Sequence, residues 1–482
     1  MLFNSLEFLF FLPVVFILYW FVFKGIKSRN LFLLAASYFF YAWWDWRYLS
    51  LILFCSVTNY LAGLFLMKTD VQKYRKTILT VCCLVSLGVL GVFKYYDFFV
   101  QSFVDAFSLF GVKLQSHTLN LILPVGISFY TFHTLSYTID VYRRQFGPTK
   151  NIVSFFLFVS IFPLAMAGPI ERATNLLPQI YKQRIFNYAM ATDGLRQVLW
   201  GLFKKLIIAD NCAVCVNSIF SSYDTLPASS LWLGAFLFTL QIYGDFSGYS
   251  DMALGIGKLL GFNFLRNFNY PYFSRDIAEF WRRWHISLTT WFRDYIYIPL
   301  GGSRVSKTVS IRNTFIIFLV SGFWHGANWT FLVWGFLHAL LFIPLLISNK
   351  NRRFTDVVAA NSIFPTIKEF FQMLSTFLFV MFLWVIFRAE TISEATSYLI
   401  RMFDISSIAM APSKALSAGW GWYFWIIAVF VVEWIARREQ HGMVILTYIR
   451  YRSIRYTIYL LFILIFLYFS STQPAQFIYF QF

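Results

Sequence analysis

The stretch SGFWHGANWTFLVWGFLHALLFIPLLI, residues 321–347, decides the fold class of this protein. Its second part, Trp329–Ile347, is an apolar run close to the roughly 20 residues that cross a bilayer as a helix. Its first part places His325 among apolar and aromatic neighbours. An ionisable side chain at bilayer depth is costly, so His325 is a candidate functional residue. A neutral imidazole is also well suited to move a proton near neutral pH.

The rest of the chain has the same apolar character. Of its 482 residues, 59% are hydrophobic, 22% are aromatic and only 13% are charged. Soluble domains carry roughly a quarter charged residues, so this composition predicts that lipid replaces water as the main solvent. Apolar runs long enough to span a bilayer recur from Leu6–Phe23 to Tyr456–Phe469. Because helices satisfy their own backbone in lipid, we expect an all-α polytopic membrane protein.

The net charge of +18 does not indicate a nucleic-acid partner, because the basic residues gather in short loops between the apolar runs. These clusters are Lys24/Lys27/Arg29, Lys68/Lys73/Arg75/Lys76, Arg143/Arg144/Lys150, Lys350/Arg352/Arg353 and the region Arg437–Arg455. Such loops face the cytoplasm under the positive-inside rule, which puts the tail Ser470–Phe482 outside. The five cysteines lie in apolar surroundings without a histidine cluster, so we expect no metal site.

The middle of the chain is less regular than its two ends. Glycines and prolines interrupt residues 123–300, and among them Gly244 and Gly248 are expected to break a helix. Non-helical backbone at membrane depth persists only inside protein or beside a water-filled cavity, so this block is expected to line an internal site. We interpret residues 1–482 as one membrane domain. It comprises N-terminal spans in 1–142, a catalytic core in 143–348 and C-terminal spans in 349–482.

A second histidine lies forty positions upstream of His325. Helical spacing predicts one amphipathic helix over Glu279–Phe292, with Trp281 and His285 on one face and arginines on the next. One interpretation is an interfacial helix whose Trp and Arg side chains anchor at lipid headgroups. The other is a re-entrant helix whose arginines bind phosphates of an anionic ligand while His285 faces the cavity.

Polar residues near these histidines leave two interpretations open as well. His325 is either a packing histidine or a catalytic one; Gly322 and Gly326 allow close helix approach beside it. The run Gln241–Asp251 carries two aspartates in apolar context, which either orient a histidine and bind a hydroxylated substrate or form a structural network.

Five segments in this order resemble the membrane-bound O-acyltransferase (MBOAT) superfamily, in particular its bacterial branch similar to alginate O-acetyltransferases. They are MLFNSLEF (1–8), LPVGISFYTF (123–132), YGDFSGYSDMA (243–253), FWRRWHISL (280–288) and GFWHGANW (322–329). The resemblance implies a ring of tilted transmembrane helices around a thin centre, with a cytoplasmic and an external funnel. It also implies that His325 is the hallmark histidine of the family and His285 its second active-site residue.

On that basis we expect His325 to act as the general base, with His285 beside it. The residues expected to support them are Asn328, Asp245, Asp251 and Trp324. Those expected to contact the phosphates of coenzyme A are Arg282, Arg283, Lys204 and Lys205.

The resulting hypothesis is an enzyme of the bacterial inner membrane with several spans. It moves an acyl group, expected to be acetyl, from a cytoplasmic thioester such as acetyl-CoA across the membrane to an exported polysaccharide. No bound cofactor is expected; membrane lipids and an external or periplasmic acetyl-transfer protein are the expected partners. Two alternatives remain: a D-alanyl transfer protein of the teichoic-acid type, and a transporter of lipid-linked sugars without covalent chemistry.

Overall fold

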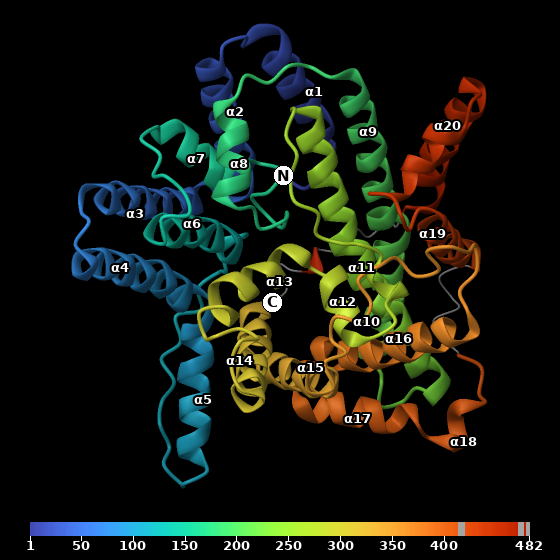
Figure 1. The fold of residues 1–482 in the computed structure, drawn as a ribbon. Helices are drawn as coiled ribbons and strands as arrows, with labels where there is room; N and C mark the ends of the chain where they lie inside the picture. The colour runs from blue at the N-terminus through green and yellow to red at the C-terminus, as the bar shows by residue number, and fades with distance from the viewer. Residues whose placement is uncertain (413–419, 471–476, 479–482) are drawn as a thin grey trace. The chain divides into compact units, whose positions relative to one another are not determined.

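The computed structural model describes residues 1–412, 420–470 and 477–478, and every regular element in these ranges is a helix (Figure 1). The α-helices are α1 (Leu6–Ile17), α2 (Ile26–Asp45), α3 (Leu49–Lys68), α4 (Gln72–Leu90), α5 (Tyr96–Ser108), α6 (Ile127–Tyr142), α7 (Ile152–Ser160), α8 (Ala173–Tyr181), α9 (Tyr188–Phe203), α10 (Asp210–Phe220), α11 (Ala228–Leu259), α12 (Ile277–Arg283), α13 (Ile286–Phe292), α14 (Lys307–His325), α15 (Trp329–Ile347), α16 (Ile367–Arg388), α17 (Ile392–Met402), α18 (Ile405–Ile408), α19 (Tyr423–Ile435) and α20 (Arg452–Phe469). Among the π-helical segments is Lys204–Ala209, which continues α9. The predicted all-α class is confirmed.

Several of these helices match the lengths that a bilayer requires. Within the described residues, five helical stretches are long and apolar enough to cross a membrane: Ile26–Lys68, Gln72–Ser108, Trp329–Ile347, Ile367–Arg388 and Arg452–Phe469. Two shorter apolar helices are Leu6–Val22 and Tyr423–Ile435. These stretches coincide with apolar runs seen in the sequence, and they describe a multi-pass membrane protein.

The chain forms two compact units. The first comprises Met1–Thr192 and Ile256–Leu265, and the second comprises Asp193–Gly255 and Arg266–Phe482. The interpretation of residues 1–482 as one domain, with the subdivision given above, stays a prediction.

In the first unit, α3, α4 and α6 pack side by side (Figure 1). A buried polar cluster joins them. Asn59 on α3 donates from Nδ2 to the Ser86 hydroxyl on α4 at 3.1 Å, and its Oδ1 accepts from the Thr138 hydroxyl on α6 at 2.7 Å. Interhelical hydrogen bonds of this kind hold membrane helices together, because lipid provides no hydrophobic drive between them.

In the second unit, glycines let α11 approach the chain of α9 closely. A Cβ at Gly248 would lie 2.8 Å from the carbonyl oxygen of Gly201, and one at Gly255 would lie 2.5 Å from that of Gly194. The prediction that Gly244 and Gly248 break a helix is wrong, because α11 runs unbroken through both. These glycines allow close contact between two helix backbones and do not interrupt the helix.

Glycines also allow close backbone contact in the hairpin of α14 and α15. A Cβ at Gly322 would lie 2.2 Å from the carbonyl oxygen of Phe331, and one at Gly335 would lie 2.3 Å from that of Phe318. These reciprocal contacts make the two helices antiparallel neighbours at backbone distance. Gly322 is three residues before His325, so this packing fixes the end of α14 on which that histidine lies.

The single helix predicted over Glu279–Phe292 is also wrong. The chain forms α12 and α13, separated by Trp284 with extended backbone and His285 with left-handed backbone (φ 45°, ψ 51°). The helical hydrogen bonds lost at the break are replaced by Asn267, whose backbone oxygen accepts from the Ile286 N–H at 2.9 Å. Because this partner comes from a distant loop, periodicity within the segment does not reveal the break.

Candidate active site

His285 and His325 lie together inside the second unit. His325 is the last residue of α14 and His285 immediately precedes α13; they are 4% and 0% exposed. Their ring centroids are 6.4 Å apart. At this separation the rings do not hydrogen-bond to each other directly. Residues forty positions apart in the sequence therefore form one buried imidazole pair.

Aromatic rings surround the pair. Trp324 lies 5.0 Å from the His325 ring and 5.8 Å from the His285 ring, measured between centroids. Phe246 of α11 lies 4.7 Å from His285, and Phe387 of α16 lies 5.4 Å from His325. Such walls exclude water, which strengthens electrostatic interactions inside the site. Trp324, one of the predicted supporting residues, thus contacts both histidines.

The burial of His285 determines its protonation. His285 lies outside the candidate membrane-spanning helices, and desolvation by burial lowers its pKa to about 3. The imidazole is therefore neutral at physiological pH and carries one N–H and one lone pair. Its Nδ1 lies 3.1 Å from Oδ1 of Asn267, which is fully buried.

A third histidine belongs to the same cluster and was missed by the sequence-based prediction. His338 of α15 is fully buried, and its Nδ1 accepts a hydrogen bond from the Trp281 indole at 3.3 Å. The Trp334 ring lies between it and the pair, 4.6 Å from His338 and 5.3 Å from His325. An ionisable side chain within the apolar run Trp329–Ile347 was the available signal.

Asp251 and Lys204 form an ion pair instead of lining the histidine pair. Lys204 Nζ lies 2.6 Å from Asp251 Oδ2 and donates to the Ser247 hydroxyl at 2.8 Å. Nearby, the Tyr243 hydroxyl donates to Glu433, whose carboxylate is 3.9 Å from Lys204. Glu433 was not singled out from the sequence, although a carboxylate inside an apolar run is itself a signal.

Asp245 and Lys205 form a second buried pair. Lys205 Nζ is 2.8 Å from Asp245 and 2.9 Å from Asp210. Asp245 also accepts from the backbone N–H of Ile478 at 2.6 Å, so it anchors a described part of the C-terminal tail. Carboxylates balance the charge of both Lys204 and Lys205, and both side chains are buried, so neither is placed as an exposed ligand for phosphate. Their contact with coenzyme A stays a prediction, and this geometry does not favour it.

Arg282 and Arg283 hold the segment that follows α15. Arg282 donates to the backbone oxygens of Asn351 and Phe354, both at 2.6 Å. Arg283 pairs with Glu279 at 2.8 Å and donates to the backbone oxygen of Asp356 at the same distance. These contacts give the two arginines a structural task, and their predicted contact with phosphates is untested.

Asn328 caps α15. Its Oδ1 accepts from the Thr330 N–H at 3.0 Å, and its Nδ2 donates to the Glu390 backbone oxygen at 2.8 Å. Satisfying a helix N-terminus in this way stabilises the turn that follows His325. The side-chain amide at hydrogen-bond distance from His285 is that of Asn267, and Asn328 supports the hairpin of α14 and α15.

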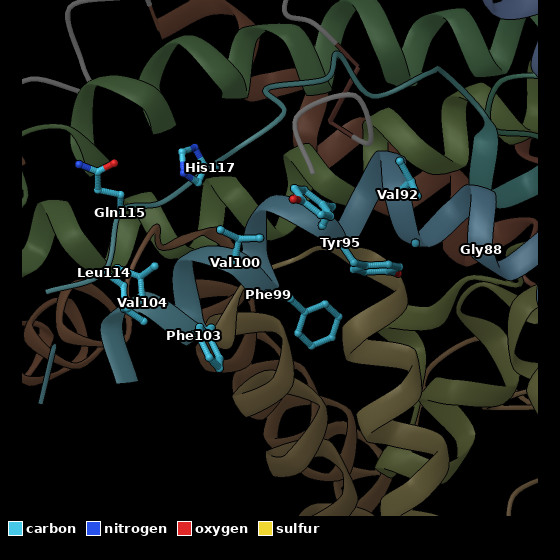
Figure 2. Close-up of a pocket in the computed structure, with 12 residues that line it drawn as sticks. Gly88, Val92, Tyr95, Phe99, Val100, Phe103, Val104, Leu114, Gln115 and His117 are labelled. Carbon is cyan, nitrogen blue, oxygen red and sulfur yellow. The ribbon is translucent and has the colours of Figure 1, made fainter. Parts of the chain in front are cut away.

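A large groove lies elsewhere, within the first unit (Figure 2). It has a volume of about 890 Å³, and α5 contributes Phe99, Val100, Phe103 and Val104 to its wall. Figure 2 shows the segment carrying Leu114 and His117 beside this helix. The lining is mainly apolar and contains neither His285 nor His325.

Among the described residues, no group of three or more His, Cys, Asp or Glu side chains is arranged to hold a metal.

Comparison with known proteins places this arrangement in a family. The model of the membrane-bound O-acyltransferase family matches residues 38–385, a range that contains both histidines. The chain belongs to the membrane-bound O-acyltransferase family. This confirms the resemblance drawn from the sequence, and it makes the protein an enzyme that transfers acyl groups to hydroxyls.

Individual relatives of this acyltransferase agree with the family match. It is 42% identical to a probable alginate O-acetylase of Pseudomonas aeruginosa over 84% of its own chain and 76% of that protein. It is 35% identical to a peptidoglycan O-acetyltransferase of Helicobacter pylori, covering 85% of this chain and 81% of the other. A teichoic acid D-alanyltransferase of Bacillus subtilis is 29% identical over 46% of this chain and 58% of its own.

These findings decide between the classes of protein considered above. An acyltransferase family that matches most of the chain excludes the hypothesis of a transporter without covalent chemistry. The D-alanyl transfer protein is a more distant relative than the O-acetyltransferases.

Proposed function

We propose that this enzyme O-acetylates an exported cell-envelope polysaccharide in the bacterial inner membrane, with a cytoplasmic thioester such as acetyl-CoA as donor. The observation that carries the proposal is the buried pair of His285 and His325, with 6.4 Å between ring centroids, in a chain of this family. Support for acetyl and for polysaccharide comes from relatives named as an alginate O-acetylase and a peptidoglycan O-acetyltransferase.

The chemistry requires one base near one hydroxyl. The acceptor oxygen attacks the thioester carbonyl carbon, a C–O bond forms, the C–S bond breaks and the thiol leaves. The hydroxyl proton passes to an imidazole and then to the thiolate, so charge and atoms balance. A positioned general base contributes about 10²–10⁴-fold to such a step. The sequence assigns the base to His325, and we retain that assignment as part of the proposal.

The acetyl group follows the same route whether the final acceptor is the polysaccharide or an intermediate carrier. A partner protein outside the membrane, which we expect to complete the transfer, acts downstream of the histidine pair. Its chemistry does not change what the buried site must do, namely deprotonate a hydroxyl and exclude water.

The proposal is tested in cells, which supply any partner protein. The gene is deleted and restored, and the polysaccharide fraction is hydrolysed in alkali so that ester-linked acetate and D-alanine are measured in the same sample. We expect deletion to remove acetate while D-alanine is unchanged, and restoration to return it. Loss of D-alanine with unchanged acetate would establish the D-alanyl alternative instead.

A further inference from the structure

Asn267 holds the turn that carries His285. It lies in the loop ahead of α12 and is fully buried. Its backbone oxygen accepts the Ile286 N–H at 2.9 Å, and its side-chain Oδ1 accepts the Ser287 N–H at 3.3 Å and the Ser287 hydroxyl at 2.9 Å. One residue therefore satisfies the first two backbone donors of α13 from outside the helix.

The same side chain decides which nitrogen of His285 carries the proton. A backbone N–H can only donate, so the Asn267 atom facing Ser287 N must be the amide oxygen and not the amide nitrogen. That oxygen lies 3.1 Å from Nδ1 of His285. An oxygen acceptor at hydrogen-bond distance requires a donor, so Nδ1 bears the hydrogen and Nε2 bears the lone pair.

We infer that Asn267 is a positioning residue for the acyl transfer: it fixes the orientation of His285 and holds its ring as the Nδ1–H tautomer, with the lone pair on Nε2. This inference rests on the proposed function. In the proposed function the acceptor hydroxyl gives its one proton to His325, and His285 acts as the second, neutral imidazole of the pair, whose ring orientation and tautomer Asn267 sets.

Two features show what this arrangement costs. His285 adopts left-handed backbone at φ 45°, a conformation uncommon for residues other than glycine, and strain of this kind concentrates at functional sites. The Asn267 Nδ2 group is buried and makes no hydrogen bond to any residue that the structure describes. Burying an unsatisfied donor costs about 1–3 kcal/mol, so we attribute the presence of an amide at this position to the hydrogen bonds that its oxygen accepts.

Two charged groups near His285 are held in ion pairs with other residues. Of the elements packed near it, α14 contributes the titratable His325. Asp245 on α11 is paired with Lys205, and Arg283 on α12 is paired with Glu279. Burial keeps the ring of His285 neutral, and the Asn267 oxygen at 3.1 Å is the side-chain acceptor that faces its Nδ1.

The tautomer itself is measured first, independently of activity. The full-length protein is labelled with ¹⁵N-histidine in lipid bilayers, and its His285 signals are identified by their loss in His285→Gln. Solid-state NMR then distinguishes protonated from unprotonated ring nitrogens. We expect Nδ1 protonated and Nε2 unprotonated at neutral pH, with the pattern lost in Asn267→Leu. An unprotonated Nδ1 in the wild type would overturn the inference.

Kinetics of acyl transfer provide the second test. Asn267→Leu keeps the approximate shape but removes the acceptor, and because misplaced groups at a reacting centre cost about 10²-fold in rate, we expect kcat to fall by about that factor with an unchanged donor KM. Asn313→Leu is the matched control, because Asn313 is equally buried and binds the Leu300 backbone oxygen far along α14. Equal loss in both variants, per folded molecule, would mean that Asn267 is merely structural.

Asn267→Asp guards against failure of the leucine variant to fold. It retains an oxygen acceptor but adds a negative charge, which stabilises the imidazolium form of His285. The acidic limb of the pH–rate profile should therefore move to higher pH, by about 1–3 units. An unmoved limb contradicts the inference. If no variant, nor the wild type, transfers acyl groups, the proposed function fails while the NMR measurement still decides the role of Asn267.

Discussion

Replacing Gly322 by alanine tests how the α14–α15 hairpin holds the histidine site. The added Cβ would lie 2.2 Å from the Phe331 carbonyl oxygen and 3.0 Å from its carbonyl carbon. A comfortable C···O contact is about 3.3 Å, so α15 must withdraw by roughly 1 Å. The clashing atoms belong to backbone and cannot rotate away as a side chain does.

Two energies oppose each other in this variant. Overpacking a tight contact costs about 1–3 kcal/mol, whereas alanine gains about 1 kcal/mol over glycine in helix propensity. Because the clash involves backbone, we expect the cost to exceed the gain and the melting temperature of the detergent-solubilised protein to fall. A displacement of about 1 Å at reacting groups lowers the rate about 10²-fold, so acetyl transfer should fall more than stability does.

Gly88→Ala is the matched control for this prediction. Gly88 lies within α4, and a Cβ there would meet nothing within 4 Å. It gains the same helix propensity without a clash, so we expect unchanged or slightly raised stability and wild-type transfer. If Gly322→Ala behaved like Gly88→Ala in both melting and transfer, the contact between the two helices would not position His325, and the reasoning would be refuted.

Three further predictions concern residues outside the histidine pair. Arg282→Ala should make the segment near Phe354 more sensitive to proteases while the donor KM stays unchanged; a raised KM with an intact segment would restore the predicted phosphate contact. Lys205→Met leaves carboxylates such as Asp245 buried without their cation, which should lower stability by about 3–5 kcal/mol, measured by chemical denaturation in detergent; a wild-type denaturation midpoint would argue against the ion pair. Asp70→Cys in a cysteine-free background should resist a membrane-impermeant thiol reagent in intact cells and react after permeabilisation, because the loop at 68–76 is predicted to be cytoplasmic; labelling of intact cells would contradict that topology.

The sequence predicted those features that depend on the composition of a single segment. Runs such as Trp329–Ile347 are apolar whatever surrounds them, so the helices that cross the membrane were predictable. His325 and His285 were identifiable because polar groups are rare in such context. Their mutual distance was not predictable from spacing, since it depends on how α14 packs against residues of other helices.

What the sequence did not reveal depends on contacts between distant segments. Gly248 looks like a helix breaker by itself, but next to Gly201 it becomes a contact point for two backbones. The break at Trp284–His285 contains no glycine or proline, because Asn267 supplies the missing hydrogen bonds from a loop. Lys204 and Lys205 looked like ligands for phosphate because their carboxylate partners lie on other helices.

The central claim is that the buried histidines carry out the acyl transfer, and His325→Gln tests it most directly. Glutamine retains hydrogen bonding at similar size but cannot take up a proton at neutral pH. The measurement is ester-linked acetate in the polysaccharide of cells that produce the variant at wild-type level in the membrane. The account predicts a loss of about 10²–10⁴-fold in transfer rate, whereas acetylation above about half the wild-type level would contradict it.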